Sequence, residues 1–320
     1  MSVKWGLLST ALINEAILRG ASESHNVDVI AVASRDEERA RSYADEHGLA
    51  RSYGSYEGLL DDPDIEAVYI SLPNSLHVEW TLQALDAGKH VLVEKPFSRR
   101  PAEVERAFDA AEAAGLVLSE GFMWRHHPQT NRLVELIDSG VAGRVRVVRT
   151  AFAFDLAAER GTGDTRFSPA LDGGALMDVG CYCISGLRLV AGEPERARGE
   201  QIVGPSGVDV VFTGALAFAD GVVGHFDCGF IVPRRGGLEV VGEEATILVP
   251  DPFTPKTPRI EVQRPGAEPE QISIEPENSY RFELDNVSAA IRGEAPLLLG
   301  REDAVGQART IDELYRSAAR

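Results

Sequence analysis

The sequence predicts an α/β protein with two domains: the first has a parallel sheet, and the second is α+β with a large, mostly antiparallel sheet. Short apolar runs alternate with helical patterns over the first 120 residues. Further along the chain, β-rich segments are joined by turns that contain Gly, Asp and Pro. A length of 320 residues also suits two domains. We place the boundary near Gly121, so the expected domains are residues 1–121 and 122–320.

The strands expected in the first domain are short and apolar, as in Val27–Ala33, which indicates burial on both faces. Pro101 begins the last helix and glycines follow several others, as is usual at helix ends. This alternation implies a parallel sheet with right-handed crossovers. The expected strands are Val3–Leu8, Val27–Ala33, Ala67–Ser71, His90–Val93 and Leu116–Ser119, and the expected helices are Ile13–Ala21, Arg35–Gly48, His77–Ala87 and Pro101–Ala114.

The second domain is expected to combine several strands with helices near its two ends. Ala219-Asp220-Gly221 lies between two β-rich runs and indicates a hairpin. Pro250–Pro269 is rich in proline, which favours a loop or an edge strand. The expected strands are Arg144–Phe154, Asp209–Phe218, Val222–Phe230, Leu238–Val241 and Thr246–Val249, and the expected helices are Asn131–Ser139, Tyr280–Arg292 and Glu302–Ala319.

The chain is acidic, with 32 Lys and Arg against 50 Asp and Glu and a formal net charge of -18. This charge disfavours wrapping nucleic acid or binding an anionic membrane, because both partners need a basic face. No run approaches the roughly 18 apolar residues of a spanning helix, and residues 1–13 resemble a strand and turn rather than a signal peptide. Three cysteines, Cys181, Cys183 and Cys228, favour a reducing compartment over a disulfide framework, so we expect a cytoplasmic protein.

The turn after the first strand is a candidate phosphate-binding turn. Dinucleotide-binding folds hold a pyrophosphate between a strand and a helix N-terminus, usually with a G-x-G-x-x-G fingerprint. Here Ser9 and Ala11 take the places of the first two glycines, and both are small enough for the backbone to approach phosphate. An ordinary strand–helix turn is the alternative interpretation. The residues assigned to the cofactor in this turn are Ser9, Thr10, Ala11, Leu12 and Ile13.

The end of the second strand indicates which dinucleotide is bound. NAD enzymes usually place an acidic residue there for the ribose 2′-hydroxyl. Here the strand ends in Ser34-Arg35, and a hydroxyl with a guanidinium suits a 2′-phosphate. The sequence therefore favours NADP, while Asp36 directly afterwards leaves NAD as the alternative. In the competing interpretation, Ser34 caps the next helix and Arg35 is a solvated residue of its first turn.

Two longer motifs resemble the Gfo/Idh/MocA family of oxidoreductases. The first is LPNSLH at 72–77 followed by GKHVLVEKP at 88–96, where Glu-Lys-Pro comes after a strand. The second is GGALMDVGCY at 173–182. The resemblance covers essentially the whole chain and implies a Rossmann domain, then an α+β domain, with the active site between them. That site lies at the C-terminal edge of the parallel sheet, as is general for open α/β folds.

The resemblance places Lys95 and Tyr182 at the substrate oxygen. Hydride exchange with a nicotinamide needs a group that moves a proton at that oxygen and a partner for developing negative charge. A neighbouring ammonium lowers the pKa of a tyrosine from its usual value of about 10 by stabilising the phenolate. Asp178 lies four residues before Tyr182, so on a helix the two share a face, and in relatives this acid faces the substrate. A helix-terminal charge and a core aromatic are the alternative roles.

The resemblance also assigns the remaining site residues. Pro96 is expected to fix the backbone, after a cis peptide bond in relatives. His126 and His127 are adjacent and cannot both face one site on a regular element, and we expect no metal, which this chemistry does not need. Phe152 and Phe154 are expected to pack in the sheet. The cofactor set is completed by Leu72, Pro73, Asn74, His77, Glu94, Lys95, Trp124 and Arg125, and the substrate set is Lys95, Arg166, Asp178 and Tyr182, with Asp172 nearby.

The sequence thus predicts an NADP-dependent oxidoreductase acting on a sugar, a sugar derivative or a cyclic diol. Tyr182, where many relatives have histidine, resembles the branch with dihydrodiol and xylose dehydrogenases and glucose–fructose oxidoreductase. The resemblance further implies a homodimer or homotetramer that pairs through the C-terminal sheet. Two alternatives stay open: a dinucleotide-binding regulatory protein without turnover, and a redox-neutral enzyme that uses tightly bound NAD on a glycoside.

Overall fold

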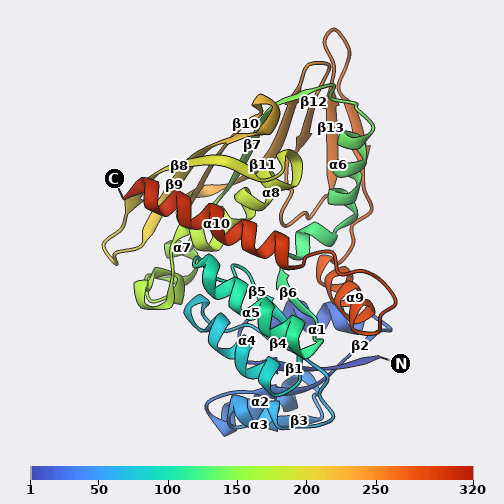
Figure 1. Cartoon of the computed structure of the whole chain (residues 1–320), viewed down its shortest axis with the longest axis vertical. Coiled ribbons are helices and arrows are strands. Elements are labelled where there is room, and N and C mark those ends of the chain that lie inside the picture. Colours follow the sequence, from blue (N-terminus) through green and yellow to red (C-terminus); the bar gives the residue numbers. More distant parts are fainter. Residues whose placement is uncertain (1, 320) are drawn as a thin grey trace. The chain divides into compact units, whose positions relative to one another are not determined.

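The computed structural model describes residues 2–319, which divide into two compact units (Figure 1). The first unit consists of the residues up to His126 together with Asn278–Val305. The second consists of His127–Glu277 together with the residues from Gly306 onward. The fold class agrees with the expectation, because one unit has a parallel sheet and the other a large, mostly antiparallel one. The division differs from the consecutive domains 1–121 and 122–320 expected from the sequence.

Within the described residues, the first unit has a six-stranded parallel sheet in the order β3-β2-β1-β4-β5-β6. Every strand and helix expected here is confirmed to within a few residues. The strands are β1 (Val3–Leu8), β2 (Val27–Ala33), β3 (Arg51–Tyr53), β4 (Ala67–Ile70), β5 (His90–Glu94) and β6 (Leu118–Gly121), and the helices are α1 (Asn14–Ser22), α2 (Glu37–His47), α3 (Tyr56–Leu60), α4 (His77–Asp86) and α5 (Pro101–Ala114). The sequence did not predict β3 and α3, because each is too short to show a periodic pattern.

The helix α9 (Ser279–Ile291) belongs to the first unit, although it follows the whole second sheet in the chain. Its apolar face, with Leu284 and Val287, is part of the same core as Trp5 and Ile17. The indole N–H of Trp5 also donates to the hydroxyl of Ser288 over 3.3 Å. The apolar face of α9 is therefore buried on α1 and β1, which explains why the second unit is not one continuous segment.

The second unit has an eight-stranded sheet in the order β14-β13-β12-β11-β7-β10-β9-β8, counted over the described residues. The β10–β7 pair is parallel and the other pairs are antiparallel. The helix α8 packs on β7 and β10. The strands are β7 (Val145–Asp155), β8 (Pro194–Val203), β9 (Asp209–Phe218), β10 (Val223–Gly229), β11 (Ile231–Gly242), β12 (Thr246–Val249), β13 (Arg259–Gln263) and β14 (Glu270–Ser273), and the helices are α6 (Pro128–Asp138), α7 (Leu156–Arg160), α8 (Cys181–Ala191) and α10 (Arg301–Ala318). The part of α10 up to Val305 is assigned to the first unit.

The expected hairpin at Ala219-Asp220-Gly221 is confirmed, since these residues connect the antiparallel strands β9 and β10. Two expectations for this sheet are corrected. Part of Pro250–Pro269 forms β13, which lies between β12 and β14 rather than at an edge. No strand was expected at β8, because four of its ten residues are charged and only Ala197 and Gly199 are buried in it. This segment forms a strand because its backbone pairs with β9, which its composition does not indicate.

One helical stretch, Pro169–Ala191, is long and apolar enough by composition to cross a membrane. No such stretch was expected from the sequence. Of its most apolar window, 78% is buried inside the protein, as in the core helix of a globular domain. Packing against the sheet of the second unit thus accounts for its apolar side chains.

The side chain of Glu283 on α9 is an unusual buried acid. The residue is 1% exposed, and its Oε1 has no hydrogen-bond partner among the described residues. Burial raises the pKa of Glu283 well above 4.5, and the charge of Glu94 adds to the effect. The folded chain therefore holds this proton more tightly than the unfolded chain does.

We expect Glu283→Gln to stabilise the protein at pH 8 by about 1 kcal/mol or more, because the amide carries no charge to desolvate. The contribution of Glu283 to stability is complete below its unfolded pKa of 4.5 and is lost as the pH rises through the folded pKa. Urea unfolding at pH 5 and pH 8 measures this difference. A variant that tracks the wild type at both pH values would contradict the prediction.

Candidate active site

The turn between β1 and α1 retains the backbone of a glycine fingerprint without the glycines. Ser9 has a φ of 136°, in the region that favours glycine. Its carbonyl accepts a hydrogen bond from Asn14 Nδ2 over 2.7 Å. Its hydroxyl lies 2.8 Å from the hydroxyl of Ser71 and accepts the N–H of Ala11 over 3.1 Å. These side-chain hydrogen bonds offset the cost of a serine in this conformation.

The same turn leaves donors available to an anion. Within residues 2–319, the N–H groups of Leu12 and Ile13 have no protein acceptor. They lie directly before α1, where unsatisfied N–H groups and the helix dipole favour negative charge. Small side chains at Ser9 and Ala11 permit close approach to the backbone. The turn therefore fits the pyrophosphate of a dinucleotide.

At the end of β2, the structure separates the roles of three neighbouring residues. Asp36 caps α2, because its Oδ1 accepts the N–H of Arg39 over 2.9 Å. The Ser34 hydroxyl accepts the N–H of Asp36 over 3.3 Å, whereas Arg35 is exposed. Burial raises the pKa of Tyr56, and Arg35 close to its hydroxyl opposes this shift. Asp36 is thus engaged by its own helix, and Arg35 presents the exposed charge at this position.

The segments after β4 and β5 are joined by His77. This residue is 1% exposed, and its ring nitrogens face two backbone carbonyls: Nε2 lies 2.7 Å from the oxygen of Leu72, and Nδ1 lies 3.0 Å from that of Pro96. Burial lowers the pKa of His77, and the charge of Lys95 acts in the same direction. The Lys95–Pro96 peptide bond is cis, as expected from the sequence. The ring of His77 therefore supports the backbone next to Pro73, Asn74 and Lys95.

Two further residues expected at the cofactor are engaged with protein groups in the first unit. Glu94 accepts a hydrogen bond from the hydroxyl of Tyr69. Burial raises the pKa of Tyr69 well above 10, and the charge of Glu94 adds to it. Arg125 Nη1 lies 3.1 Å from Asp303 Oδ1, and its neighbour Trp124 is fully buried. A cofactor phosphate would compete with Asp303 for this guanidinium.

In the second unit, the segment that carries Asp178 and Tyr182 begins at a pair of glycines. A Cβ on Gly173 would lie 2.3 Å from the carbonyl oxygen of Arg166, and one on Gly174 would lie 2.2 Å from Asp209 Oδ1. Asp209 Oδ2 accepts the N–H of Leu176 over 2.7 Å, so it caps this segment from the start of β9. Without side chains on the two glycines, both the Arg166 loop and the capping carboxylate can approach closely.

The capping carboxylate of Asp209 is itself held in place. Its Oδ1 accepts the hydroxyl of Tyr315, on α10, over 2.8 Å. Burial raises the pKa of Asp209, and the hydrogen bonds from Leu176 and Tyr315 oppose this shift. Neither Asp209 nor Tyr315 was predicted to belong to the site, because they lie far from the GGALMD motif in the sequence.

The structure brings together Arg166 and Asp178, two of the residues expected to bind substrate. Arg166 Nη1 donates to Asp178 Oδ2 over 3.1 Å. Arg166 also donates to both carboxylate oxygens of Asp164, over 2.8 and 3.0 Å, which lowers the pKa of Asp164. Asp172 ends a short turn nearby in the chain with a positive φ of 52°. Asp164 orients Arg166 but was not predicted, because no local pattern marks it.

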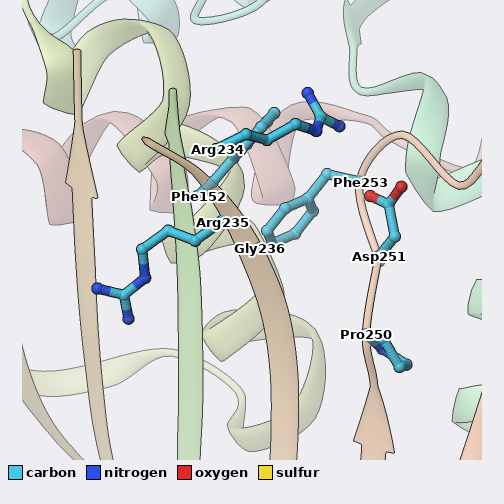
Figure 2. A pocket seen from close by; sticks show the side chains of 7 residues that line it. All are labelled: Phe152, Arg234, Arg235, Gly236, Pro250, Asp251 and Phe253. Atoms are coloured by element: carbon cyan, nitrogen blue, oxygen red, sulfur yellow. The ribbon is translucent and has the colours of Figure 1, made fainter. Parts of the chain in front are cut away.

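Tyr182 lies just after a π-helical turn, Leu176–Gly180, at the start of α8. Such turns are frequent at functional sites. The ring of Tyr182 packs against those of Phe152 and Phe253, with centroids 5.5 Å apart in each case. These two phenylalanines also line a pocket of 270 Å³ (Figure 2) together with Arg234, Arg235, Gly236, Pro250 and Asp251. Phe152 is therefore a packing residue as expected, but it also forms part of a pocket wall.

The comparisons with known proteins identify the class. Residues 6–122 match the model of the oxidoreductase family with an NAD-binding Rossmann fold, and residues 130–248 match the GFO/IDH/MocA C-terminal domain. The chain therefore belongs to the Gfo/Idh/MocA family of oxidoreductases, which confirms the resemblance seen in its motifs.

Individual relatives are similar over nearly the whole chain. D-xylose 1-dehydrogenase (NADP(+)) 2 of Haloferax volcanii is 38% identical over 319 residues, which cover 98% of this chain and 97% of that protein. Trans-1,2-dihydrobenzene-1,2-diol dehydrogenase of Bos taurus is 34% identical over 79% of this chain and 75% of that protein. A crystal structure of a 3-ketoreductase from Actinomadura kijaniata with NADP and TDP-benzene aligns with a TM-score of 0.91, 29% identity and coverage of 99% and 98%. Variants of that enzyme with one lysine or one tyrosine replaced have also been solved.

We expect Gly173→Ala to destabilise the second unit by about 1–3 kcal/mol, because the added Cβ would force the backbone of Arg166 to move. Gly163→Ala is the matched control, since no atom lies within 4 Å of a Cβ at that position in the same loop. Thermal unfolding of both variants measures the difference. Equal melting temperatures for the two would show that the Gly173 contact is unimportant.

Proposed function

We propose that this protein is an NADP-dependent oxidoreductase that transfers a hydride between the nicotinamide and a CH–OH or C=O carbon of a sugar, sugar derivative or cyclic diol. The observation that carries the proposal is the hydrogen bond from Arg166 to Asp178, which lies on the same segment as Tyr182, in a member of an oxidoreductase family. The names of the relatives support the substrate class, because they include an NADP-dependent xylose dehydrogenase and a dihydrodiol dehydrogenase.

In this proposal the chain's own groups handle the proton and the substrate hydroxyls. A nicotinamide dinucleotide held by the first unit would supply the hydride chemistry. Tyr182 gives or takes the proton at the reacting oxygen, and Lys95 stabilises negative charge there and favours the phenolate. Asp178 accepts hydrogen bonds from substrate hydroxyls, and Arg166 holds that carboxylate in place.

The cofactor residues divide by the part of the dinucleotide that they meet. We assign the pyrophosphate to the N–H groups of Leu12 and Ile13 and the turn Ser9-Thr10-Ala11. Ser34 and Arg35 take the 2′-phosphate, because Asp36 is committed to capping α2. Leu72, Pro73 and Asn74 border the nicotinamide, supported by His77. Glu94, Trp124 and Arg125 complete the cofactor side.

We expect Arg35→Ala to weaken NADPH binding about 10- to 100-fold while leaving NADH binding nearly unchanged, because only the 2′-phosphate loses a charge-assisted partner. Fluorescence titration of both cofactors measures this. Arg41→Ala serves as the control, because Arg41 is an exposed arginine farther along the chain, on α2. A wild type that prefers NADH would refute the NADP assignment.

We expect Tyr182→Phe to lower kcat at least about 100-fold while NADPH binding stays within a few fold, because the hydroxyl acts only in proton transfer. The assay follows NADPH absorbance in both directions over a panel of D-xylose, other aldoses, aldonolactones, ketosugars and a trans-dihydrodiol. Tyr53→Phe is the control, since its hydroxyl instead donates to Asp62. NADPH binding without turnover of any compound would favour a regulatory protein instead.

We further propose a homo-oligomer that forms through the uncovered face of the second unit's sheet. Thr213, Ala215 and Val223 are exposed on neighbouring strands there, and Val223 is 49% exposed. On the same sheet, Arg149 pairs with Glu239 over 2.6 Å. A face of small, apolar and paired charged residues suits a second copy of the chain.

Light scattering is expected to give a multiple of 34.6 kDa for the wild type and a smaller mass for Ala215→Glu, which places a charge on that face. A monomeric wild type would rule this interface out.

We also propose a cytoplasmic location, because the three cysteines are buried and, over residues 2–319, none forms a disulfide.

A further inference from the structure

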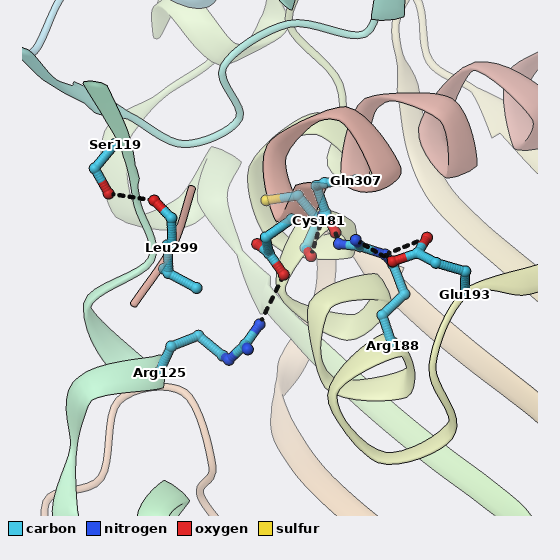
Figure 3. Close-up of polar contacts among 8 residues, drawn as sticks. Ser119, Arg125, Cys181, Arg188, Glu193, Leu299 and Gln307 are labelled. Atoms are coloured by element: carbon cyan, nitrogen blue, oxygen red, sulfur yellow. Dashed lines mark hydrogen bonds and ion pairs between the residues drawn. The ribbon is translucent and has the colours of Figure 1, made fainter. Parts of the chain in front are cut away.

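A buried amide joins α10 to the peptide group next to Tyr182. Gln307 Nε2 donates to the carbonyl oxygen of Cys181 over 2.7 Å. Gln307 Oε1 accepts from Arg188 Nη1 over 3.0 Å. Figure 3 shows this chain of contacts from Cys181 through Gln307 and Arg188 to Glu193. All four residues belong to the second unit.

The chemistry of the partners fixes the orientation of the Gln307 amide. A guanidinium only donates hydrogen bonds, so the amide oxygen must face Arg188. The amide nitrogen is then directed at Cys181, whose carbonyl oxygen has two lone pairs and can accept a second donor beside its helical bond. Arg188 is held in turn, because its Nε lies 3.1 Å from both carboxylate oxygens of Glu193. In this series of hydrogen bonds, Glu193 orients Arg188, and Arg188 orients the Gln307 amide.

The surroundings leave little freedom for these side chains. Gln307 is 1% exposed, and the side chain of Arg188 is 3% exposed. A Cβ on Gly306 would lie 2.3 Å from Arg188 Nη2 and 2.5 Å from Glu193 Oε2. The glycine before Gln307 therefore leaves room for the guanidinium against α10, and a larger residue there would make Arg188 and Glu193 shift. Burying a charge in this way usually gains little stability over an apolar contact, so a role in orientation is the better explanation.

The Cys181 carbonyl is well placed for such a role. It belongs to the peptide group that leads into Tyr182, at the junction between the π-helical turn Leu176–Gly180 and α8. A wide turn of this kind shifts the register of the residues after it. A fixed donor at the Cys181 oxygen selects one orientation of that peptide plane and hence one direction for the Tyr182 side chain.

We propose that Gln307 is a positioning residue for Tyr182, acting through the Cys181 carbonyl and held by Arg188 and Glu193. The inference rests on the proposed role of Tyr182 in proton transfer. Gln307 thus connects α10 directly to the segment that carries Asp178 and Tyr182, and Tyr315 connects it indirectly, through the capping residue Asp209.

The test compares three variants in the whole protein. Gln307→Glu keeps the shape of the side chain and an acceptor for Arg188 but loses the donor to Cys181. Gln307→Met loses both the acceptor and the donor. Thr310→Val is the control, because Thr310 is buried on the same helix and its hydroxyl donates to the Gly306 carbonyl of that helix. We expect both Gln307 variants to lower kcat about 10- to 100-fold with KM nearly unchanged, and to raise the isotope effect of deuterated NADPH. Thr310→Val is expected to match the wild type in both measurements.

The double variant with Tyr182→Phe separates this inference from the proposed function. If Gln307 acts through Tyr182, the double variant is no slower than Tyr182→Phe alone. Additive losses, or a fully active Gln307→Glu, overturn the positioning role while leaving Tyr182 as the proton-transfer residue. A fully active Tyr182→Phe rejects the role of Tyr182 itself, and with it the inference. The substrate is the panel compound that the wild type converts fastest.

Amide hydrogen exchange supplies a readout that needs no substrate. The positioning role predicts faster exchange over residues 176–186 in Gln307→Glu than in Thr310→Val, with the rest of the chain unchanged. Unchanged exchange in that segment contradicts the role. If Gln307→Met fails to fold, Gln307→Glu retains the contact to Arg188 and keeps the comparison valid.

Discussion

The arrangement of the second unit's site depends on one buried carboxylate. Asp209 accepts the N–H of Leu176 and the hydroxyl of Tyr315, so it joins the start of β9, the Tyr182 segment and α10. A buried acid is costly unless donors surround it, and here the donors belong to the elements that must be aligned. The absence of a side chain at Gly174 lets the carboxylate reach the backbone. The capped segment carries Asp178, whose carboxylate accepts a hydrogen bond from Arg166.

In the first unit, too, polar side chains fix the backbone around the candidate site. Ser9 adopts a conformation that favours glycine, and Asn14 and Ser71 hold it there. His77 links the carbonyls next to two loops at the edge of the sheet. In both places a polar side chain hydrogen-bonds to loop backbone and holds it in position, because loops lack the repeating backbone hydrogen bonds of helices and strands. Pre-organised loops of this kind reduce the entropy lost when a cofactor binds.

Several buried polar groups lower the stability of the fold, which does not require a polar residue at their positions. Glu283 is a buried acid without a partner for one oxygen, and Arg188 is a buried cation whose partner Glu193 is 62% exposed. Apolar residues of similar size would fill these places at lower cost. Natural proteins tolerate such departures mainly near functional sites. Arg188 follows that rule, because it orients the side-chain amide of Gln307, which donates to the carbonyl of Cys181 next to Tyr182.

The sequence by itself determined the fold class, most elements and the family, because apolar periodicity, turn residues and the EKP and GGALMD motifs are local signals. It also indicated Arg35 and Asp178, which lie in or beside such motifs. Only the tertiary structure decided that α9 joins the first unit, that β13 lies inside a sheet, and that Asp209, Tyr315 and Gln307 support the Tyr182 segment. These features depend on contacts between residues far apart in the chain. A hydrogen-bond partner more than 100 residues away leaves no pattern in its own neighbourhood, so only the folded chain shows which polar residues meet.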